Sequence, residues 1–432
     1  MAISTIDDAV GRVRSADTLA VPLGPGIPGA FLHALGDRGE FEDLRIFGAL
    51  LNDLYAVFTL PGVHYRCGFF GPAERFLRDA GVDLEYVPAD FRRFAPIIES
   101  IRPRVIATAA APPDADGWMS LSLHAGATVD ELHRCAAADD RVLIVEYSAA
   151  YPTTLGLGEQ HRHRIHVDEA DVVFESDRTP VLIEDPPPDD IDRAIAEHAM
   201  KFVSDGCTLQ TGIGSIPSVI AALIADGDGG DYGIHSEMFT TGLMQLHKAG
   251  KVTNRKGRFD GHSITTFAAG TPELYEWLDG NTDVRFLPVD VVNSPEAIAE
   301  NRRMVTINGA LAIDLAGQVV ADTIDGTQFS GLGGHEDFVS GPGLRLEDRS
   351  LLCLRSTAVV GGKARSRIVA ELAAGSVIST PRHQVDVVIT EHGIAELEGR
   401  TVRERAAALI EIAAPEFRDE LRQAADTARF LG

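Results

Sequence analysis

The sequence predicts an α/β protein made of two related open α/β domains with mainly parallel sheets. Its 432 residues are 45% hydrophobic, and chains longer than about 250–300 residues usually divide into domains. Short runs rich in Val, Ile and Leu, such as residues 17–23, 103–110 and 141–148, alternate with helical patterns. This alternation is typical of parallel sheets that are covered by helices on both faces.

The domain boundary is expected in IEDPPPDDID, residues 183–192, because three consecutive prolines interrupt strands and helices alike and the carboxylates favour water. We therefore predict domains at residues 1–187 and 188–432. Each half places a Gly-x-Gly turn and an Ile-Pro pair between an apolar strand and a helix, in LAVPLGPGIPGAFLHAL and in CTLQTGIGSIPSVIAALI. The repeat indicates related domains, although coincidence explains it equally well.

The formal charge of −25 opposes binding of nucleic acid or anionic lipid, except at a local basic pocket. The sequence contains no signal peptide pattern and no run of roughly 20 apolar residues that could span a membrane. Its four cysteines are scattered, which indicates neither a disulfide framework nor a zinc site. We expect a soluble cytoplasmic protein with no nucleic-acid partner, no membrane partner and no bound metal.

Two glycine segments could present backbone N–H groups to a ligand. Gly212, Ile213, Gly214 and Ser215 follow an apolar strand and open a helix, where N–H groups can receive a phosphate or an oxyanion. A tight turn that needs glycine is the alternative explanation. In SGLGGHEDF, residues 330–338, three glycines allow close approach of a ligand, and a surface loop is the alternative.

His161, His163 and His166 raise a metal hypothesis. The interleaved Arg162 and Arg164 would repel a cation, and alternating residues on an edge strand explain the pattern better. The G-x-S-x-G and H-E-x-x-H motifs of serine hydrolases and zinc proteases are absent from the sequence.

Lys363, Arg365 and Arg367 form the most concentrated basic patch of this acidic chain. They could contact the phosphates of a nucleotide-bearing ligand. An ordinary solvated face is the alternative.

Glu237 stands in GIHSEMF, residues 233–239, where an apolar strand ends. Ligands of open α/β sheets collect at the carboxyl ends of strands, so a carboxylate exposed there can reach a substrate. A glutamate that caps the helix expected from Met238 onward is the alternative.

Together, these stretches resemble the acetyl-CoA hydrolase/transferase family, which includes acetate, butyrate, succinate and 4-hydroxybutyrate CoA-transferases. The resemblance lies in TLQTGIGSIP, DYGIHSEMFTTGLMQL with AGKVTN, NSPEAIAENRRMVTINGALAIDLAGQVVADTIDG, SGLGGHEDF and STPRHQVDVVITEHGIAELEGRT. It covers nearly all of residues 195–420. PPDADGWMSLS and the FFG of residues 69–71 are similar to the family more loosely.

The resemblance implies that Glu237 is the catalytic nucleophile and that Gly212 to Ile216 form a CoA-binding loop. It also implies that the loop with Gly331, Gly333 and Gly334 lies over the thioester, and that the active site lies between two open α/β domains. A homo-oligomer, either a dimer or a tetramer, is expected from the resemblance alone.

CoA carries several phosphate charges, so an acidic protein that binds it needs positively charged side chains at the binding site. The candidates are Arg349, Lys363, Arg365 and Arg302. Arg349 occupies a place where similar members of the family usually have a lysine.

The first half departs from the family pattern at two places. Glu146 to Ala149 replace an Asn-Pro pair, and Pro152 to Thr154 replace a Pro-Arg-Thr run. These departures put the acyl or acceptor specificity in doubt more than the covalent chemistry.

The resemblance thus implies a ping-pong CoA-transferase that takes an acyl-CoA and a short-chain carboxylate and carries CoA as a thioester on Glu237. The glycine loop at residues 331–334 and the turn at residues 212–214 are the candidate N–H donors for its oxyanions. An acyl-CoA hydrolase with the same glutamate, and a CoA-binding protein without turnover, are the alternatives.

Overall fold

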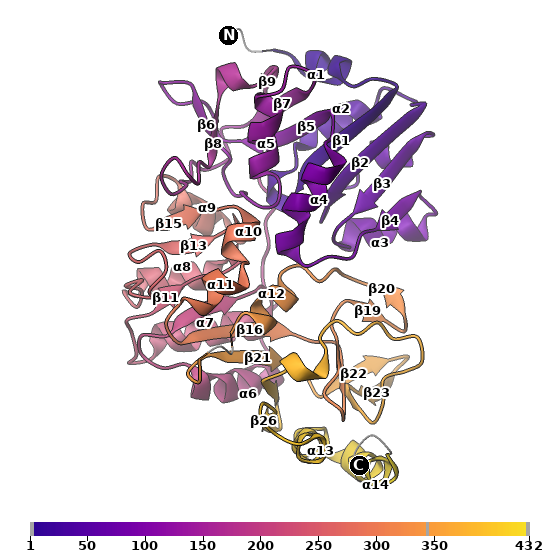
Figure 1. Cartoon of the computed structure of the whole chain (residues 1–432), viewed down its shortest axis with the longest axis vertical. Coiled ribbons are helices and arrows are strands. Elements are labelled where there is room, and N and C mark those ends of the chain that lie inside the picture. Colours follow the sequence, from indigo (N-terminus) through magenta and orange to yellow (C-terminus); the bar gives the residue numbers. More distant parts are fainter. Residues whose placement is uncertain (1–3, 343–344, 429–432) are drawn as a thin grey trace. The chain divides into compact units, whose positions relative to one another are not determined.

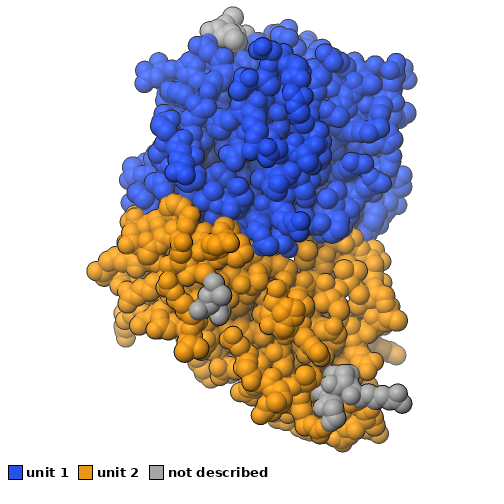
Figure 2. Space-filling view, viewed as in Figure 1, with its two compact units in different colours: residues 1–183, 237–241, 262–293 blue, residues 184–236, 242–261, 294–432 orange. Residues whose placement is uncertain are grey.

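The protein is described by a computed structural model that covers residues 4–342 and 345–428. The chain forms two compact units, which Figure 2 shows in different colours. Unit 1 consists of residues 1–183, 237–241 and 262–293, and unit 2 of residues 184–236, 242–261 and 294–432. Each unit contains a mainly parallel sheet with helices, which confirms the predicted fold class.

These units differ from the two continuous domains that the sequence predicts. The chain enters unit 2 at Glu184, within the proline-rich stretch, but it returns to unit 1 at Glu237 and again at His262. Phe267 and Val289 of the returning segments are buried in a hydrophobic core of unit 1. The crossings at residues 236–237 and 241–242 are only a few residues apart, so the inserted segments cannot be recognised from the sequence as a domain boundary.

Unit 1 is built on a seven-stranded sheet in the order β4-β3-β2-β1-β5-β7-β9, in which all neighbouring strands are parallel (Figure 1). Its strands are β1 (Ala16–Leu23), β2 (Asp43–Ala49), β3 (Val63–Cys67), β4 (Leu84–Tyr86), β5 (Val105–Ala110), β7 (Val142–Tyr147) and β9 (Val172–Glu175). Its helices are α1 (Ile6–Arg12), α2 (Gly29–Gly36), α3 (Pro72–Asp79), α4 (Phe94–Ile101), α5 (Val129–Ala136), α9 (Pro272–Leu278) and α10 (Val289–Val292). The 3-10 turns are η1 (Gly24–Gly26), η2 (Ala56–Thr59), η3 (Phe91–Arg93) and η4 (Val167–Glu169).

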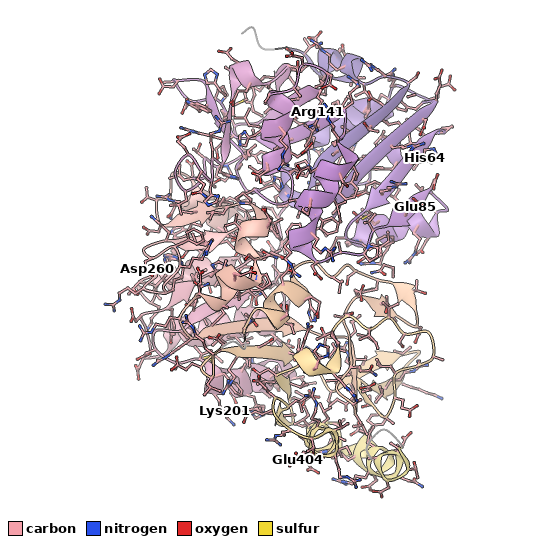
Figure 3. All side chains as sticks on the ribbon, in the orientation of Figure 1. His64, Glu85, Arg141, Lys201, Asp260 and Glu404 are labelled. Atoms are coloured by element: carbon pink, nitrogen blue, oxygen red, sulfur yellow. The ribbon has the colours of Figure 1, made fainter. Side chains whose placement is uncertain are left out.

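The sheet of unit 1 is buried on both faces. Leu19 and Val21 of β1 belong to one hydrophobic core, and Ala20 between them belongs to another, because successive side chains of a strand point to opposite faces. Residues of α1 and α2 line the first core, and residues of α4 and α5 line the second. At the edge of the sheet, Figure 3 labels Glu85 on β4 and His64 on the neighbouring β3, and charged side chains there discourage pairing with further strands.

Unit 2 is built on a six-stranded sheet in the order β11-β10-β16-β21-β25-β26, in which only the β25–β26 pair is antiparallel. Its strands are β10 (Thr208–Thr211), β11 (Gly233–Ile234), β16 (Met304–Gly309), β21 (Arg349–Cys353), β25 (Val387–Thr390) and β26 (Gly393–Glu396). The helices wholly or mainly in this unit are α6 (Asp190–Ala199), α7 (Ser215–Asp226), α8 (Thr241–Lys248), α11 (Pro295–Ala299), α12 (His335–Ser340), α13 (Val402–Glu411) and α14 (Arg418–Thr427). The 3-10 turns are η5 (Met200–Phe202), η6 (Arg382–Gln384) and η7 (Pro415–Phe417).

The two faces of this second sheet again carry separate cores. Leu351 of β21 packs in the core shared with α6 and α7, and Leu352 packs in the core shared with α13 and α14. The end of the chain forms two separate helices, α13 and α14. Pro415 lies at the break, where a proline lacks the N–H that a continuous helix requires.

Smaller sheets complete both units. They pair β6 (Trp118–Ser120) with β8 (Arg164–His166), β12 (Met238–Phe239) with β14 (Phe267–Ala268), β13 (Ser263–Thr265) with β15 (Val284–Phe286), β17 (Ala312–Asp314) with β18 (Val319–Val320) and β24 (Ile368–Val369), β19 (Thr323–Ile324) with β20 (Thr327–Gln328), and β22 (Thr357–Val360) with β23 (Lys363–Ser366). Among the described residues, no helix is both long and apolar enough to cross a bilayer.

Glu146 of β7, one of the residues that depart from the family pattern, ties two elements of unit 1 together. Its buried carboxylate accepts hydrogen bonds from Ala30 N at 3.1 Å, Phe31 N at 2.9 Å and Ser176 Oγ at 2.9 Å. Pro28, the N-cap of α2, makes no side-chain capping bond. The Glu146 carboxylate instead accepts hydrogen bonds from N–H groups of the first turn of that helix. Burial raises the pKa of the Glu146 carboxyl, and these bonds oppose the rise.

We therefore expect Glu146→Ala to destabilise unit 1. One buried and one partly buried N–H group of α2 lose their acceptor, which should lower the free energy of unfolding by about 1–3 kcal/mol. The measurement is the midpoint of urea unfolding. Glu85→Ala, at the exposed position of strand β4, is the control, expected to change stability by less than about 0.5 kcal/mol. Equal midpoints for the two variants would contradict the capping role.

Candidate active site

The backbone of Glu237 is held by three donors of unit 1. The carbonyl oxygen of Glu237 accepts hydrogen bonds from Thr266 N at 3.0 Å, Phe267 N at 3.2 Å and Thr265 Oγ1 at 2.9 Å. Met238 and Phe239 then form β12 beside β14, and α8 begins only at Thr241. The expected helix from Met238 onward is therefore wrong at its start. Glu237 is half-buried and directly precedes the short strand β12, and three hydrogen bonds to its carbonyl oxygen hold its backbone.

Asn293 holds the side chain of Glu237. Its Nδ2 donates to Glu237 Oε2 at 2.6 Å, and Asn293 itself is fully buried at the end of α10. A hydrogen bond donated to a carboxylate stabilises the ionised form, which is the nucleophilic form. The sequence does not reveal Asn293 as a partner of Glu237, because the two residues are 56 positions apart and no local motif links them.

The chain just before Glu237 lies beside the start of the Gly212 loop. In unit 2, β11 pairs in parallel with β10, and His235 N donates to Leu209 O at 3.1 Å. Ser236 Oγ then donates to Thr211 O at 3.1 Å. The residue that precedes Glu237 is thus hydrogen-bonded to the residue that precedes Gly212.

The two Gly-x-Gly turns of the predicted repeat both connect a strand to a helix, but they differ in packing. The turn of β1 and α2 is buried, and a Cβ added to Gly26 would lie 2.6 Å from the His124 ring. The turn of β10 and α7 is half-buried, Ile213 is exposed, and a Cβ added to Gly212 would meet no atom within 4 Å. Only the second turn leaves open space over its backbone, as a ligand-binding loop requires.

One predicted N–H donor of this turn is already engaged. Gly214, with φ +121°, is the N-cap of α7, and its N–H donates to Asp185 Oδ1 at 2.7 Å. Ser218 Oγ donates to the other carboxylate oxygen of Asp185. The proline-rich linker thus supplies the anion at this helix N-terminus, which favours negative charge. The structure therefore gives no support to Gly214 as a free oxyanion donor.

The second predicted loop, with Gly331, Gly333 and Gly334, runs from β20 to α12. Gly333 has φ +52°, a left-handed conformation that glycine adopts without steric cost. Thr306 Oγ1, in the middle of β16, donates to Phe338 O of α12 at 2.8 Å. Helices of parallel β-α-β connections run back along the strands, so the start of α12 and the loop before it lie toward the carboxyl end of β16.

By this geometry, three segments of unit 2 lie toward the carboxyl edge of its sheet. The Gly212 turn follows β10, the segment with His235 and Ser236 follows β11, and the glycine loop lies toward the end of β16. The rings of His235 and Phe338 are 6.4 Å apart, which joins the second segment to α12. In open α/β sheets, this carboxyl edge is where ligands bind.

Arg349 does not lie at this edge. It is the first residue of β21 and is aligned with Val305 at the amino end of the sheet. Its guanidinium donates to the main-chain oxygens of Leu346 at 3.0 Å and Asp348 at 2.7 Å. Asp386, whose pKa burial raises to about 6, interacts with the same guanidinium. The fold therefore gives no support to Arg349 as a CoA ligand, since parallel strands put their two ends on opposite edges.

Lys363 and Arg365 lie on the exposed hairpin of β22 and β23, which turns through Gly361 and Gly362. Their position fits a solvated face and a phosphate contact alike, so the role of Lys363 in CoA binding stays a prediction. Arg302 precedes β16, at the amino edge with Arg349.

The histidine cluster has a structural explanation. His163 is buried, its ring stacks on Phe286 at 5.1 Å, and its Nε2 lies 2.8 Å from Ser122 O. His166 belongs to β8, and its Nε2 lies 2.9 Å from Asp116 O. Within residues 4–342 and 345–428, no group of three or more His, Cys, Asp and Glu side chains is arranged to hold a metal ion.

Comparison with known proteins identifies the family. The family model of the acetyl-CoA hydrolase/transferase C-terminal domain matches residues 270–425. The 4-hydroxybutyrate coenzyme A transferase of Clostridium kluyveri is 36% identical, over 96% of this chain and 95% of that protein. The chain belongs to the acetyl-CoA hydrolase/transferase family.

Other relatives agree with this assignment. The succinyl-CoA:cyclohexane-1-carboxylate CoA transferase of Geobacter metallireducens is 34% identical, over 97% of this chain and 93% of that protein. The crystal structure of RipA from Yersinia pestis matches with a TM-score of 0.88 and 30% identity, over 100% of this chain and 98% of RipA. The predicted family and the predicted enzyme class, a CoA-transferase, are confirmed.

Asn293 gives the first test of this CoA-transferase site. We expect Asn293→Ala to lower kcat/KM for CoA transfer about 10- to 100-fold, because a hydrogen bond to a charged group is worth about 1.5–3 kcal/mol. Steady-state kinetics at saturating and limiting acyl-CoA measure the change. Asn301→Ala is the matched control, since Asn301 is also fully buried but donates to main-chain oxygens of α11, at 2.8 and 3.2 Å. Similar losses in both variants would argue that Asn293 supports folding only.

Gly212 gives the second test. Its φ lies outside the left-handed region and its surroundings are open, so Gly212→Ala should fold with unchanged thermal stability. If CoA lies on this loop, the added methyl should raise KM for acyl-CoA about tenfold, because overpacking by one methyl costs about 1–3 kcal/mol. Gly230→Ala is the control, since Gly230 has equally open surroundings after α7. An unchanged KM in Gly212→Ala would remove the loop from the binding site.

Proposed function

We propose that this CoA-transferase moves CoA from an acyl-CoA to a short-chain carboxylate through a thioester on Glu237. The observation that carries the proposal is the hydrogen bond of Ser236 to Thr211, because it joins the residue before Glu237 to the residue before the open Gly212 turn. The fixed backbone of Glu237 and its bond to Asn293 add support, since a covalent nucleophile must be held in one orientation.

The proposed reaction begins with attack of a Glu237 carboxylate oxygen on the thioester carbonyl carbon. The carbon–sulfur bond breaks, leaving an acyl-glutamyl anhydride and the CoA thiolate. The thiolate attacks the glutamyl carbonyl and releases the first carboxylate, so CoA is now bound to Glu237 as a thioester. The acceptor carboxylate reverses these two steps and leaves as the new acyl-CoA. Each product leaves before the next substrate reacts, which gives ping-pong kinetics.

Each step passes through a tetrahedral oxyanion that N–H donors must stabilise. In this proposal the donors come from the loop with Gly331, Gly333 and Gly334, because Gly214 N–H already donates to Asp185. Losing one such donor costs about 2.7–4 kcal/mol in comparable sites. Gly212 to Ile216 would contact CoA, with Lys363 as a candidate phosphate contact.

The carboxylate substrates are proposed from the relatives. Their names specify 4-hydroxybutyrate in one case and succinyl-CoA with cyclohexane-1-carboxylate in another. 4-Hydroxybutyrate and cyclohexane-1-carboxylate are small organic acids, and we propose an acceptor of the same class. The proposal includes a homo-oligomer and a cytoplasmic location, with CoA as a substrate.

The family description also names acetyl-CoA hydrolases, so hydrolysis is the second candidate function. Both activities would use Glu237, and exclusion of water distinguishes them. CoA release measured with and without acetate, propionate or butyrate separates the two. Turnover at full rate without an acceptor would establish a hydrolase.

Glu237 provides the central test. We expect Glu237→Ala to abolish transfer and Glu237→Asp, one methylene shorter, to lose most of it. Mass spectrometry of the intact wild-type protein with acyl-CoA should show a CoA adduct, and peptide mapping should locate it at Glu237. Glu276→Ala, an exposed glutamate of α9 in the same unit, should retain both transfer and adduct. Transfer retained in Glu237→Ala would refute the proposed nucleophile.

A further inference from the structure

The hydroxyl groups of Ser379 and Thr380 bind residues that flank the glycine loop, residues 330–334. Ser379 bonds Asp322 before the loop, and Thr380 bonds His335 and Glu336 after it. We propose that this pair positions the loop for catalysis, as a clamp whose two hydroxyls come from adjacent residues. The inference rests on the proposed function, because it assumes that the loop supplies the oxyanion donors. Ser379 and Thr380 are positioning residues in this account and need not touch the substrate.

Ser379 fixes the entry to the loop through Asp322. Ser379 Oγ donates to Asp322 Oδ1 at 2.6 Å, and the carboxylate is buried. Asp322 Oδ2 accepts from Gln328 Nε2 at 3.0 Å, and Asp322 O accepts from Ser330 N at 3.0 Å. Gln328 Nε2 also donates to Ser330 O at 2.6 Å. The first residue of the loop is therefore bonded directly to the main chain of Asp322, and through Gln328 to the Asp322 carboxylate that Ser379 holds.

Thr380 fixes the exit from the loop. Its Oγ1 donates to the carboxylate of Glu336 and lies 2.8 Å from Nε2 of His335, the first residue of α12 and the neighbour of Gly334. A hydroxyl has one proton, so Thr380 Oγ1 accepts from His335 Nε2–H while it donates to Glu336. Burial lowers the pKa of His335 to about 4, which keeps the imidazole neutral at neutral pH.

The pair itself is rigidly placed. Ser379 N donates to Val319 O at 2.9 Å, and Val319 N donates to Thr380 O at 3.0 Å. Thr380 is fully buried and Ser379 is 9% exposed, so water has poor access to replace a missing hydroxyl. Because the two hydroxyls come from adjacent residues, their separation is fixed, and they set the distance between entry and exit.

A glycine loop needs such a constraint. Glycine has the largest backbone freedom, so a loop with three glycines in four positions gains the most from fixed ends. Oxyanion donors act only when they are held within about 0.5 Å of the productive geometry. A loose clamp should therefore weaken the chemical steps more than the binding of CoA, which rests on other segments in the proposed function.

The test compares Thr380→Val with Thr380→Ser. Valine keeps the shape of threonine but removes the hydroxyl, whereas serine keeps it. We expect Thr380→Val to lower kcat and the rate of CoA adduct formation on Glu237 together, by about tenfold or more. KM for acyl-CoA should change less than about threefold, and Thr380→Ser should restore most of kcat. Ser379→Ala, which removes the hydroxyl at the entry to the loop, should also lower kcat and the rate of CoA adduct formation.

The chain offers matched controls for both substitutions. Thr390 is also fully buried in unit 2 and donates to Ile412 O at 2.6 Å, so Thr390→Val makes the same change away from the clamp. Ser356 is buried and donates to Glu391 Oε1 at 2.5 Å, so Ser356→Ala matches Ser379→Ala. We expect both controls to retain kcat once their thermal stability shows that they fold.

Two outcomes would overturn the clamp. The first is a folded Thr380→Val enzyme with unchanged kcat and adduct rate. The second is a loss that Thr380→Ser or the Thr390→Val control reproduces, which would reveal a general packing effect. If Thr380→Val does not fold, Ser379→Ala decides, and unchanged kcat there rejects the inference. Failure of the proposed function is distinct, because it would appear as full transfer in Glu237→Ala.

Discussion

The hydrogen bond from Ser236 Oγ to the carbonyl oxygen of Thr211 is the contact on which the candidate site depends. It extends the short β10–β11 pairing by joining Thr211, the residue before Gly212, to Ser236, the residue before Glu237. A carboxylate must be close to its substrate before any chemistry is available to it. Strand pairing supplies that closeness through main-chain geometry, without requiring contacts from the glutamate side chain.

The site combines rigid attachment with polar surroundings. The carbonyl oxygen of Glu237 accepts three hydrogen bonds, and Asn293 orients its carboxylate. The Gly212 turn is left open, while the equivalent turn at Gly26 is filled by His124. The same strand-turn-helix pattern therefore serves packing in unit 1 and an accessible loop in unit 2. The side chain that lies over the turn makes the difference, rather than the glycines themselves.

Much of the fold followed from the sequence, and the exceptions have clear causes. Leu19, Ala20 and Val21 are all buried, in cores on the two faces of β1, and a sequence displays such a strand directly as a continuous apolar run. The engagement of Gly214 by Asp185 and the capping of α2 by Glu146 join residues that are far apart in the chain. Such contacts depend on which strands become neighbours, and composition and spacing do not encode that order visibly.

The sequence alone determined the α/β class, the family and the candidacy of Glu237, because each rests on local periodicity or on motifs in a fixed order. Only the tertiary structure decided which candidates share an edge. It brought the Gly212 turn and the glycine loop to the carboxyl edge, and it put Arg349 at the amino edge. It also supplied Asn293. The physical reason is that strand order and direction, fixed by packing across the whole chain, set which side chains meet.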